Sequence, residues 1–425
     1  MNIYKNIFIS ILDGRTVRDL FQNDIIKFLN DEYLCPVILS EANNIEKFTS
    51  FWQNNNTIIF ERYLKISPTF KRHKSSLIRR YIASNFNFLL SAYTTFERKT
   101  FYKYDDILSK YFDEYNPISV LITHTQLHGE MPICLEAKKR DIPSIGLVRS
   151  WDNIFKGLRS RPEYLTVWNE INKIEAIEQE GYKEENIVIT GAPQFDKYFQ
   201  RHIDKLTKKE FCDLTGFDPS QKIILIATRG NFSRDLDETY LIDIILSYID
   251  DGLISKNTQL IIRLHPWSQL EVFMKYDFNK NVYISFYDEF LPSLGWSMSS
   301  NQVIEVRDML MHCDIVITPG STIALEGAIF DKPTLVPMFH SYQPERASVL
   351  FQKTSNYHFK RIIEKELIKI SWEETEFLAD IKNALNSSDW YSEERRQLLD
   401  DYIPLRDGLS TKRLTEAIED ISLNK

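Results

Sequence analysis

The chain alternates short apolar runs with longer stretches whose apolar residues have helical spacing. NIFISIL (6–12) is the first run, and VRDLFQNDIIKFLN (17–30) after it has the spacing of a helix. Strands that alternate with helices form βαβ units, which place the strands parallel in one sheet. The pattern therefore predicts an α/β protein. The other runs that we expect to be strands are residues 35–40, 118–124, 142–148, 222–228, 258–264, 281–285, 313–318 and 333–337.

The length of the chain and one break in this rhythm predict two domains. The chain has 425 residues, and a domain commonly holds about 100–200 residues. Turn-rich segments at 190–200 and 215–221 interrupt the alternation between the halves. We expect an N-terminal domain over 1–205 and a C-terminal domain over 206–395. A helical segment over 396–425 is expected to pack back on the N-terminal domain.

Composition argues against several functional classes. The formal net charge of −8 disfavours nucleic-acid binding, which usually needs a basic face. No apolar stretch approaches the roughly 18 residues of a membrane helix, and no signal cleavage site follows the first run, so a cytoplasmic protein is expected. The cysteines are far apart and form no C-x-x-C pair, which predicts reduced thiols and no zinc site.

One basic cluster lies in PTFKRHKSSLIRRYIASNFNFLL (68–90). It contains Lys71, Arg72, Lys74, Arg79 and Arg80, and aromatic residues follow it. Two interpretations stay open. The cluster is either a solvated helix face or, over 71–80, a patch for a charged acceptor or for the inner face of the cytoplasmic membrane. Each basic group near anionic lipid contributes about 1 kcal/mol.

The stretch DIVITPGSTIALEGAIF (314–330) predicts an anion site. An apolar strand ends in a Pro-Gly turn, and Ser321 and Thr322 then open a helix, whose free N–H groups attract phosphate. Gly320 lets the backbone approach closely, and Ser321 is the expected N-cap. Glu326 does not have capping-box spacing, and its carboxylate suits the hydroxyls of a ribose. An ordinary loop with a surface glutamate is the alternative.

The stretch LIIRLHPW (260–267) predicts a second part of this site. Strand alternation puts Arg263 and His265 on one face, and Pro266 stops the strand. A cation and an imidazole at a strand end suit a diphosphate, whereas a packed core histidine is the alternative. Contact with phosphate, or else a plain polar loop, is also predicted for three residues after an earlier strand: Thr228, Arg229 and Gly230.

The second half resembles the nucleotide-binding half of the GT-B glycosyltransferases. The resemblance covers ITGAPQFDKYF (189–199), the His-Pro pair, TPGSTIALEGAIFDKP (318–333) and PLRDGLSTKRLTEAI (404–417). TGAPQFD is similar to the interdomain segment of the UDP-N-acetylglucosamine 2-epimerases. RLHPW with the Ser-Thr turn resembles bacterial sialyltransferases, capsule Kdo transferases and the polyol-phosphate transferases of wall polymers. RDGLSTKR resembles the ending of that last group.

Two departures from these families affect the interpretation. The epimerases have a Ser-Gly-Gly turn with paired glutamates, whereas this chain has Gly-Ser-Thr and the single Glu326, which favours a transferase. The acidic triplet of the sialyltransferases is missing, and its nearest counterpart is LDG (12–14).

The resemblance implies two Rossmann-like domains that face a central cleft, with the donor in the second and the acceptor in the first. A bacterial enzyme of surface-polysaccharide assembly is implied, which moves a sugar from a nucleotide-activated donor to a hydroxyl of a glycan or lipid-linked glycan. No metal or other cofactor is expected. His265, Gly320, Ser321 and Thr322 would stabilise the departing phosphate. The His-Pro pair favours a CMP- or CDP-linked donor over UDP, GDP or dTDP.

Three alternatives on the same fold stay open. They are a nucleotide-sugar 2-epimerase or hydrolase, a polyol-phosphate transferase of the CDP-glycerol type, and a nucleotide-binding assembly protein without activity.

The first half should then hold the acceptor. Asp13, at the end of the first strand, is a candidate general base, and His124 is the alternative base. An Asp-Gly turn without a catalytic role is the competing interpretation of Asp13. The histidines lack a further ligand for a metal site. The residues expected to contact the acceptor or sugar are Gly14, Arg15, His128, Glu130, Trp151, Asp152 and Asn153.

Overall fold

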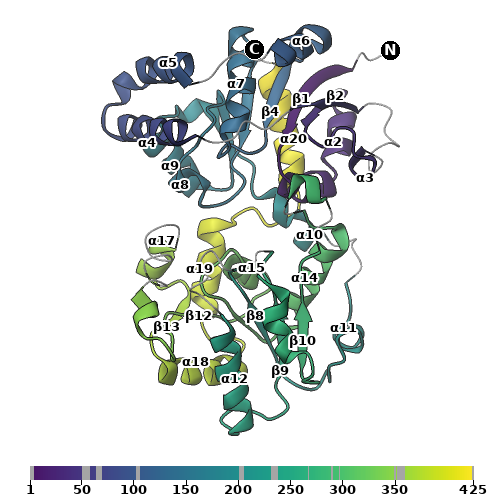
Figure 1. The fold of residues 1–425 in the computed structure, drawn as a ribbon, viewed down its shortest axis with the longest axis vertical. Coiled ribbons are helices and arrows are strands. Elements are labelled where there is room, and N and C mark those ends of the chain that lie inside the picture. The colour runs from purple at the N-terminus through teal and green to yellow at the C-terminus, as the bar shows by residue number, and fades with distance from the viewer. Residues whose placement is uncertain are drawn as a thin grey trace. The chain divides into compact units, whose positions relative to one another are not determined.

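The computed structural model describes residues 4–49, 58–63, 69–101, 106–200, 205–230, 238–266, 268–288, 291–295, 297–348, 351 and 359–423. The chain divides into two α/β units (Figure 1). Unit 1 consists of Met1–Gln200, Glu289–Ser299 and Tyr402–Lys425, and unit 2 of Arg201–Asp288 and Ser300–Asp401. Membership of residues 289–299 in the first unit was not predicted from the sequence pattern.

Unit 1 is built on a parallel sheet, whose described strands have the order β3-β2-β1-β4-β5-β6-β7. Its central strands are continuous apolar runs, because helices cover both faces of a parallel sheet. The strands are β1 (Lys5–Ile11), β2 (Leu34–Ser40), β3 (Ile59–Arg62), β4 (Ser119–Ile122), β5 (Ser144–Leu147), β6 (Tyr164–Val167) and β7 (Ile187–Ile189).

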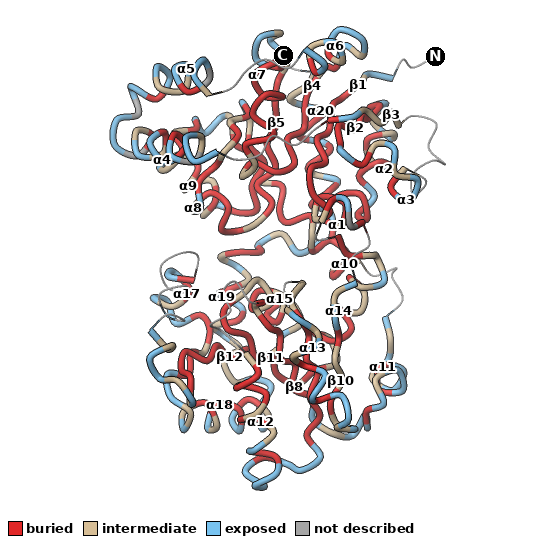
Figure 2. The backbone as a smooth tube through the Cα atoms, viewed as in Figure 1, coloured by how far each residue is buried: buried red, intermediate tan, exposed pale blue. Residues whose placement is uncertain are grey.

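Two apolar cores lie on opposite faces of this sheet, because alternate residues of β1 point to opposite sides. Ile7 and Ile9 join one core with α1 (Gly14–Asp19), α2 (Ile25–Asp31) and α20 (Ser410–Leu423), and Phe8 joins the other with α6 (Asp106–Tyr115) and α7 (Met131–Lys139). Figure 2 shows these central strands as buried. The remaining described α-helices of unit 1 are α3 (Glu46–Thr49), α4 (Phe70–Asn85), α5 (Leu90–Phe101), α8 (Asn153–Lys156), α9 (Glu170–Glu180) and α10 (Asp196–Phe199).

Two stretches that are distant in the sequence, TGAPQFD and RDGLSTKR, meet at the start of α20. The Asp196 carboxylate accepts hydrogen bonds from the backbone N–H of Ser410 (3.0 Å) and of Thr411 (2.7 Å). Arg413 donates to the Thr190 carbonyl (3.0 Å) and pairs with Asp407 (2.7 Å). Asp196 therefore caps the helix that completes one core of unit 1.

Replacement of Asp196 by alanine is expected to lower the free energy of unfolding by about 2–6 kcal/mol. Two buried N–H groups would each lose their acceptor, at about 1–3 kcal/mol apiece. Urea unfolding followed by circular dichroism measures the loss. Glu416→Ala is the control, because Glu416 lies on the same helix in an exposed pair with Lys412 and should change stability by only about 0.5 kcal/mol. Equal losses in the two variants would contradict the capping role.

Unit 2 repeats the architecture with a parallel sheet, whose described strands have the order β10-β9-β8-β11-β12-β13. Helices α12 (Thr239–Asp250) and α18 (Glu374–Asn386) pack on one face, where Ile245 and Phe377 belong to the same buried apolar cluster as Ile224 and Ile226 of β8 (Ile223–Ala227). The strands are β8 (Ile223–Ala227), β9 (Gln259–Arg263), β10 (Val282–Ser285), β11 (Ile315–Ile317), β12 (Thr334–Pro337) and β13 (Lys369–Ser371). The described α-helices are α11 (Lys208–Thr215), α12 (Thr239–Asp250), α13 (Leu270–Phe273), α14 (Ser300–His312), α15 (Ile323–Ile329), α17 (Lys360–Glu364), α18 (Glu374–Asn386) and α19 (Ser392–Tyr402).

Both sheets reverse their strand order at one position. The reversal lies between β1 and β4 in unit 1, and between β8 and β11 in unit 2. Open α/β sheets bind ligands outside the carboxyl ends of the strands at such a point. The predicted pair of Rossmann-like domains is confirmed, and each unit has one edge where a ligand is expected. No described helix has both the length and the apolar character of a membrane span.

Candidate functional site

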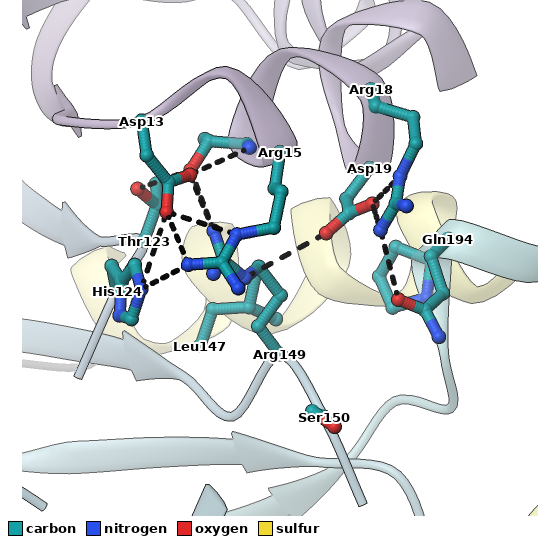
Figure 3. Close-up of polar contacts among 12 residues, drawn as sticks. Asp13, Arg15, Arg18, Asp19, Thr123, His124, Leu147, Arg149, Ser150 and Gln194 are labelled. Carbon is teal, nitrogen blue, oxygen red and sulfur yellow. Dashed lines mark hydrogen bonds and ion pairs between the residues drawn. The ribbon is translucent and has the colours of Figure 1, made fainter. Parts of the chain in front are cut away.

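Four side chains meet at the carboxyl edge of unit 1, where the strand order reverses (Figure 3). Asp13 follows β1 and is only 6% exposed. Its carboxylate lies 2.6 Å from an Arg149 nitrogen, 2.9 Å from an Arg15 nitrogen and 3.2 Å from Nε2 of His124. We call these four residues the β1/β4 cluster. It joins groups that follow β1, β4 and β5.

The electrostatics of the β1/β4 cluster fix its charges. Burial alone would raise the pKa of Asp13, but Arg149, His124 and Arg15 outweigh it and hold this pKa well below its usual value. Burial, together with the charge of Arg149, lowers the pKa of His124 to about 4, although Asp13 opposes this shift. Asp13 is therefore ionised and His124 neutral at pH 7. Among the described residues, Nδ1 of His124 has no hydrogen-bond partner.

Glu130 supports the cluster from the interior. Its carboxyl oxygens lie 2.7 Å from Oγ of Ser10 and 2.9 Å from the backbone nitrogen of His124. Burial raises the pKa of Glu130 to about 8, so the group is protonated at pH 7. A protonated Glu130 donates to Oγ of Ser10, which leaves the Ser10 proton for the Leu121 carbonyl at 3.3 Å.

Replacement of Glu130 by glutamine is expected to make the protein more resistant to alkaline pH. The folded-state pKa of about 8 lies above the ordinary value of 4.5, so the protonated form stabilises the fold below pH 4.5 and this stability is lost as the pH rises through 8. The glutamine side chain keeps one hydrogen-bond donor and one acceptor at this position, but it does not titrate. Each unit of pKa shift corresponds to about 1.4 kcal/mol, so the difference should reach several kcal/mol.

Urea unfolding of both proteins at pH 5 and pH 9 tests this expectation. The wild type should lose more stability between the two pH values than Glu130→Gln does, and the comparison cancels the titration of other groups. If the two proteins lose the same stability between pH 5 and pH 9, Glu130 is already ionised in the folded protein at pH 5.

Three loops meet at the corresponding edge of unit 2. Thr228, after β8, accepts the backbone N–H of His265 at 2.8 Å. Arg229 donates from its side chain to the Pro319 carbonyl at 3.4 Å, and the Glu238 carboxylate accepts the backbone N–H of Arg229 at 2.8 Å. The loops after β9 and β11 are thus both tied to the loop after β8. In the structure, His265 follows β9 and the predicted Gly-Ser-Thr segment follows β11. These two strands flank β8 in the sheet.

Comparison with protein families matches residues 136–420 to the family described as CDP-glycerol:poly(glycerophosphate) glycerophosphotransferase. The chain belongs to this family. The match spans all of the strands of unit 2 and part of unit 1, including Arg149, and it begins after Asp13 and His124. No individual curated protein is matched.

Solved structures similar to this member of the glycerophosphotransferase family confirm the GT-B fold. S. aureus MnaA, solved with UDP, has a TM-score of 0.58 and 14% identity over 98% of this chain and 96% of its own. The UDP-GlcNAc 2-epimerase from Neisseria meningitidis, bound to UDP-GlcNAc, has a TM-score of 0.57 and 14% identity over 98% and 100%. A glycosyltransferase from Rickettsia africae has a TM-score of 0.56 and 12% identity over the full length of both chains.

Several residues expected to contact the acceptor have interior roles in this family member. Gly14 donates its N–H to the Gly295 carbonyl (3.1 Å), and a Cβ atom at residue 14 would lie 2.4 Å from Cβ of Ser297. Gly14 is thus needed for the close approach of Gly295 and Ser297. Trp151 is 3% exposed and packs edge-on against Tyr402. It therefore has no open ring face for a sugar.

The other predicted acceptor residues are also enclosed, with the exception of Arg15. Glu130 is fully buried in the contacts given above, and His128 is buried beside it. Asp152 pairs with Lys156, and the Asn153 amide binds the Ser150 N–H and Gln126. These side chains are buried in this conformation and support the edge from the interior. The Arg15 side chain is 30% exposed.

Two predictions for the carboxyl edge of unit 2 are corrected. Arg263 is buried and donates to Oγ of Ser285 (2.7 Å) and to the Phe286 carbonyl (3.2 Å), so it ties β9 to β10. Ser321 is not an N-cap. Helix α15 begins at Ile323 after Thr322, which makes no side-chain cap, and Oγ of Ser321 lies 3.0 Å from Oγ1 of Thr318.

The other residues predicted at this edge include half-buried side chains and two buried glycines. Gly320 has a φ of 84°, a conformation that favours glycine. Glu326 lies in the first turn of α15 and is half-buried, as are His265 and Pro266. Gly230 has a φ of 83°. Within the described part of the chain, no group of three or more His, Cys, Asp or Glu side chains is arranged to hold a metal ion.

Arg149 is the main functional candidate that the sequence analysis missed. It directly follows the apolar run 142–148, at the same edge as Asp13 and His124. Its position after a predicted strand was the available signal. Its pairing with Asp13 was not predictable, because 136 positions separate the two residues.

Proposed function

We propose that this protein transfers a polyol phosphate from a CDP-linked donor to a hydroxyl of a polyol-phosphate polymer. CDP-glycerol and poly(glycerophosphate) are the first substrates to test. The observation that carries the proposal is the family match over residues 136–420. The sequence analysis placed sugar transfer first and this reaction among the alternatives, and membership of the family reverses that order.

The proposed reaction is a displacement at phosphorus. The acceptor hydroxyl oxygen forms a bond to the phosphorus that carries the glycerol. The bond from this phosphorus to the bridging oxygen of CDP breaks, and CMP leaves with the electron pair. The acceptor proton passes to a base on the protein. The proposed reaction uses no metal or other cofactor, so activity should persist in EDTA.

We assign the base to His124 and a positioning role to Asp13. His124 is neutral at pH 7, whereas Asp13 is a weak base because its pKa lies well below the usual value. Nε2 lies 3.2 Å from Asp13 and 3.1 Å from an Arg15 nitrogen, and we assign the tautomer in which Nε2–H donates to Asp13, so that Nδ1 is the atom that receives the proton. Nδ1 is buried in the free protein, so acceptor binding has to shift the residues over it. Arg15 and Arg149 supply positive charge for an anionic acceptor.

We assign the donor to the carboxyl edge of unit 2. His265 is the candidate donor to the phosphate of the departing CMP, and the Arg229 guanidinium, which lies 3.4 Å from the Pro319 carbonyl, is a second candidate. The backbone at Gly320 and the hydroxyls of Ser321 and Thr322 are candidates for further phosphate contacts. Glu326 is the candidate partner of the ribose hydroxyls. A cytoplasmic location stays a prediction.

A doubly labelled donor tests the proposed function. The protein is incubated with CDP-glycerol that carries ³²P in the phosphate next to glycerol and ¹⁴C in the glycerol, with poly(glycerophosphate) as acceptor. The expected products are CMP and a polymer that holds both labels in equal amounts. Parallel reactions use CDP-ribitol and CMP-, UDP-, GDP- and dTDP-sugars.

Two other outcomes would overturn the proposal. Release of a nucleotide from a sugar donor, with transfer of the sugar but of no donor phosphorus to the polymer, would indicate a glycosyltransferase. Turnover of a nucleotide sugar without acceptor would indicate an epimerase or hydrolase.

A further inference from the structure

Unit 1 contains a cavity of about 410 Å³ at the edge of its sheet that is opposite the β1/β4 cluster. The loops that line this cavity lie at the amino ends of β5, β6 and β7, whereas the residues of the β1/β4 cluster follow the carboxyl ends of strands. Helices α5 and α7 form the rest of its wall. Small-molecule sites commonly have volumes of roughly 300–1,000 Å³. The cavity is therefore large enough for a ligand, and it is separate from the site of the proposed reaction.

A buried ion pair lies in the wall of the cavity. Glu97 of α5 lines the cavity, and its carboxylate lies 2.7 Å from an Arg79 nitrogen of α4, with both side chains buried. Arg80, the next residue, donates to the Phe155 carbonyl. These contacts correct the sequence-based interpretation of 71–80 as one basic patch, because Arg79 and Arg80 bind within unit 1. The pairing also neutralises the charge of Glu97.

Arg161, in the loop before β6, is a half-buried cation that also lines the cavity. Its guanidinium donates to the Glu180 carbonyl (2.7 Å) and to the Gly181 carbonyl (3.5 Å), and it lies 4.5 Å from the centre of the Tyr182 ring. The two hydrogen bonds use two of the five N–H donors of a guanidinium. Within the part of the chain that the structure describes, no carboxylate pairs with Arg161.

The remaining charges of the lining cancel one another. Lys138 and Lys183 are exposed, and so are Asp141 and Glu163. Two positive and two negative side chains thus lie where the cavity opens to solvent. Because Glu97 is neutralised by its arginine partner, the charge of Arg161 makes the interior of the cavity positive, and an anion is the ligand that it favours.

The wall also has partners for hydroxyl groups. The second carboxylate oxygen of Glu97, Oε1, is buried and has no hydrogen-bond partner among the described residues. A buried acceptor without a partner is unfavourable, and a ligand O–H that reaches Oε1 after a small shift of the wall would remove this cost. Three side-chain hydroxyls also line the cavity, those of Thr94, Thr95 and Ser144. The lining therefore fits an anion that carries hydroxyl groups.

We propose that this cavity binds a polyol phosphate, with its phosphate on Arg161 and a hydroxyl on Glu97. The planar guanidinium matches the spacing of phosphate oxygens. The choice of a polyol phosphate among hydroxylated anions rests on the function proposed above, in which such units are transferred. Because the cavity lies at the opposite edge of the sheet, the bound unit is not the one that reacts. It is either free glycerol phosphate or one unit of the acceptor polymer, held at a second point.

Equilibrium dialysis of the full chain tests the proposal and separates the two sources. The ligands are ¹⁴C-labelled glycerol 3-phosphate and short poly(glycerophosphate), each without a CDP-linked donor so that no transfer occurs. Inorganic phosphate and glycerol should each bind at least about tenfold more weakly, because each offers only one half of the contacts. Binding of the free compound identifies a small-molecule site, and binding of the polymer alone identifies an anchoring site. Failure of both ligands to bind would overturn the proposal.

Variants of the lining locate the bound ligand. Arg161→Gln should bind about 10–100-fold more weakly, the usual cost of losing a hydrogen bond between charged groups. Lys138→Glu places a negative charge at the opening without altering a buried contact, and should bind about threefold to fivefold more weakly. Lys139→Glu is the matched control, because Lys139 is exposed on the same helix but does not line the cavity. If Lys138→Glu and Lys139→Glu both bind like the wild type, the ligand does not occupy the cavity.

Arg15→Gln distinguishes the cavity from the proposed acceptor site. Arg15 belongs to the β1/β4 cluster, so its loss should slow polymer synthesis and leave the binding of glycerol 3-phosphate to the cavity unchanged. Binding that is lost in Arg15→Gln but kept in Arg161→Gln would place the ligand at the β1/β4 cluster, which overturns this inference and leaves the proposed function intact. Arg161-dependent binding by a protein that transfers no polyol phosphate would overturn the proposed function alone.

Discussion

Replacing His265 by alanine is expected to lower kcat by about 10²–10³-fold, the usual cost of removing one donor to a developing oxyanion. His265 lies at the carboxyl edge of unit 2, and its backbone N–H binds Thr228 at 2.8 Å. If the imidazole stabilises the departing CMP phosphate, its contribution is larger in the transition state than in the bound donor, so kcat should fall more than donor affinity. Rapid-quench measurement of CMP release separates these two effects.

His312→Ala is the control for this prediction. His312 is a half-buried histidine of the same unit, and Nε2 lies 2.7 Å from the Leu206 carbonyl before α11. It ends α14 at the amino edge of the sheet, opposite the proposed donor site. Its replacement should leave kcat near the wild-type value. A His265→Ala variant that loses donor affinity but keeps kcat would show that His265 only binds the nucleotide.

Replacing Asp13 by asparagine is expected to lower kcat/KM by about 10²–10⁴-fold, the range that general-base catalysis contributes. Asp13 holds Nε2 of His124 at 3.2 Å and is the negative charge that raises the pKa of the imidazole. Without this charge, His124 lies beside Arg15 and Arg149 as a weaker and poorly oriented base. Asp13→Asn/His124→Ala should be no slower than His124→Ala alone, because residues that act as a unit are not additive.

Asp19→Asn is the matched control for Asp13. Asp19 is a buried carboxylate of the same edge that pairs with Arg18 at 2.6 Å and lies 3.8 Å from Arg149. Its loss should affect kcat/KM much less. If both variants are equally slow while both remain folded, the charge balance of the edge matters and the Asp13–His124 contact does not.

The pH dependence of the wild type gives the same assignment a second test. Neutral His124 is the active form, so activity falls as the pH drops through its pKa. In kcat/KM, which reports the free enzyme, this fall should be centred near the pKa of about 4. In kcat it should lie at higher pH, because a bound anionic acceptor offsets Arg15 and Arg149 and raises the pKa of His124. An unperturbed histidine would place both falls near 6.5.

Much of the fold follows from local pattern. Buried parallel strands are continuous apolar runs, so β1, β2, β8 and β9 stand out from the sequence. Strands β3, β6, β7 and β13 were not predicted, although they are no shorter than β4, β5, β10, β11 and β12, which the sequence pattern indicated. Their pairing with neighbouring strands, and not their composition, makes them strands.

The sequence indicated which types of residue form the site, but not which side chains contact one another. Polar side chains after strands indicated both edges, because parallel strands bring their carboxyl ends together. The burial of Trp151 and the inward contacts of Arg79 depend on segments that are distant in the sequence, such as Tyr402 and Glu97. Protonation could not be predicted either, since the pKa of His124 reflects burial and the charge of Arg149.

The division of unit 1 among three chain segments has a consequence for biosynthesis. Gly14 contacts Gly295, and Leu414 and Ile418 of α20 complete the core that contains Ile7. The first 200 residues leave the ribosome early but lack these partners until translation is nearly finished. Part of the apolar core of the nascent amino-terminal half therefore stays exposed until the end of translation. A fragment that ends near residue 200 should aggregate or bind chaperones.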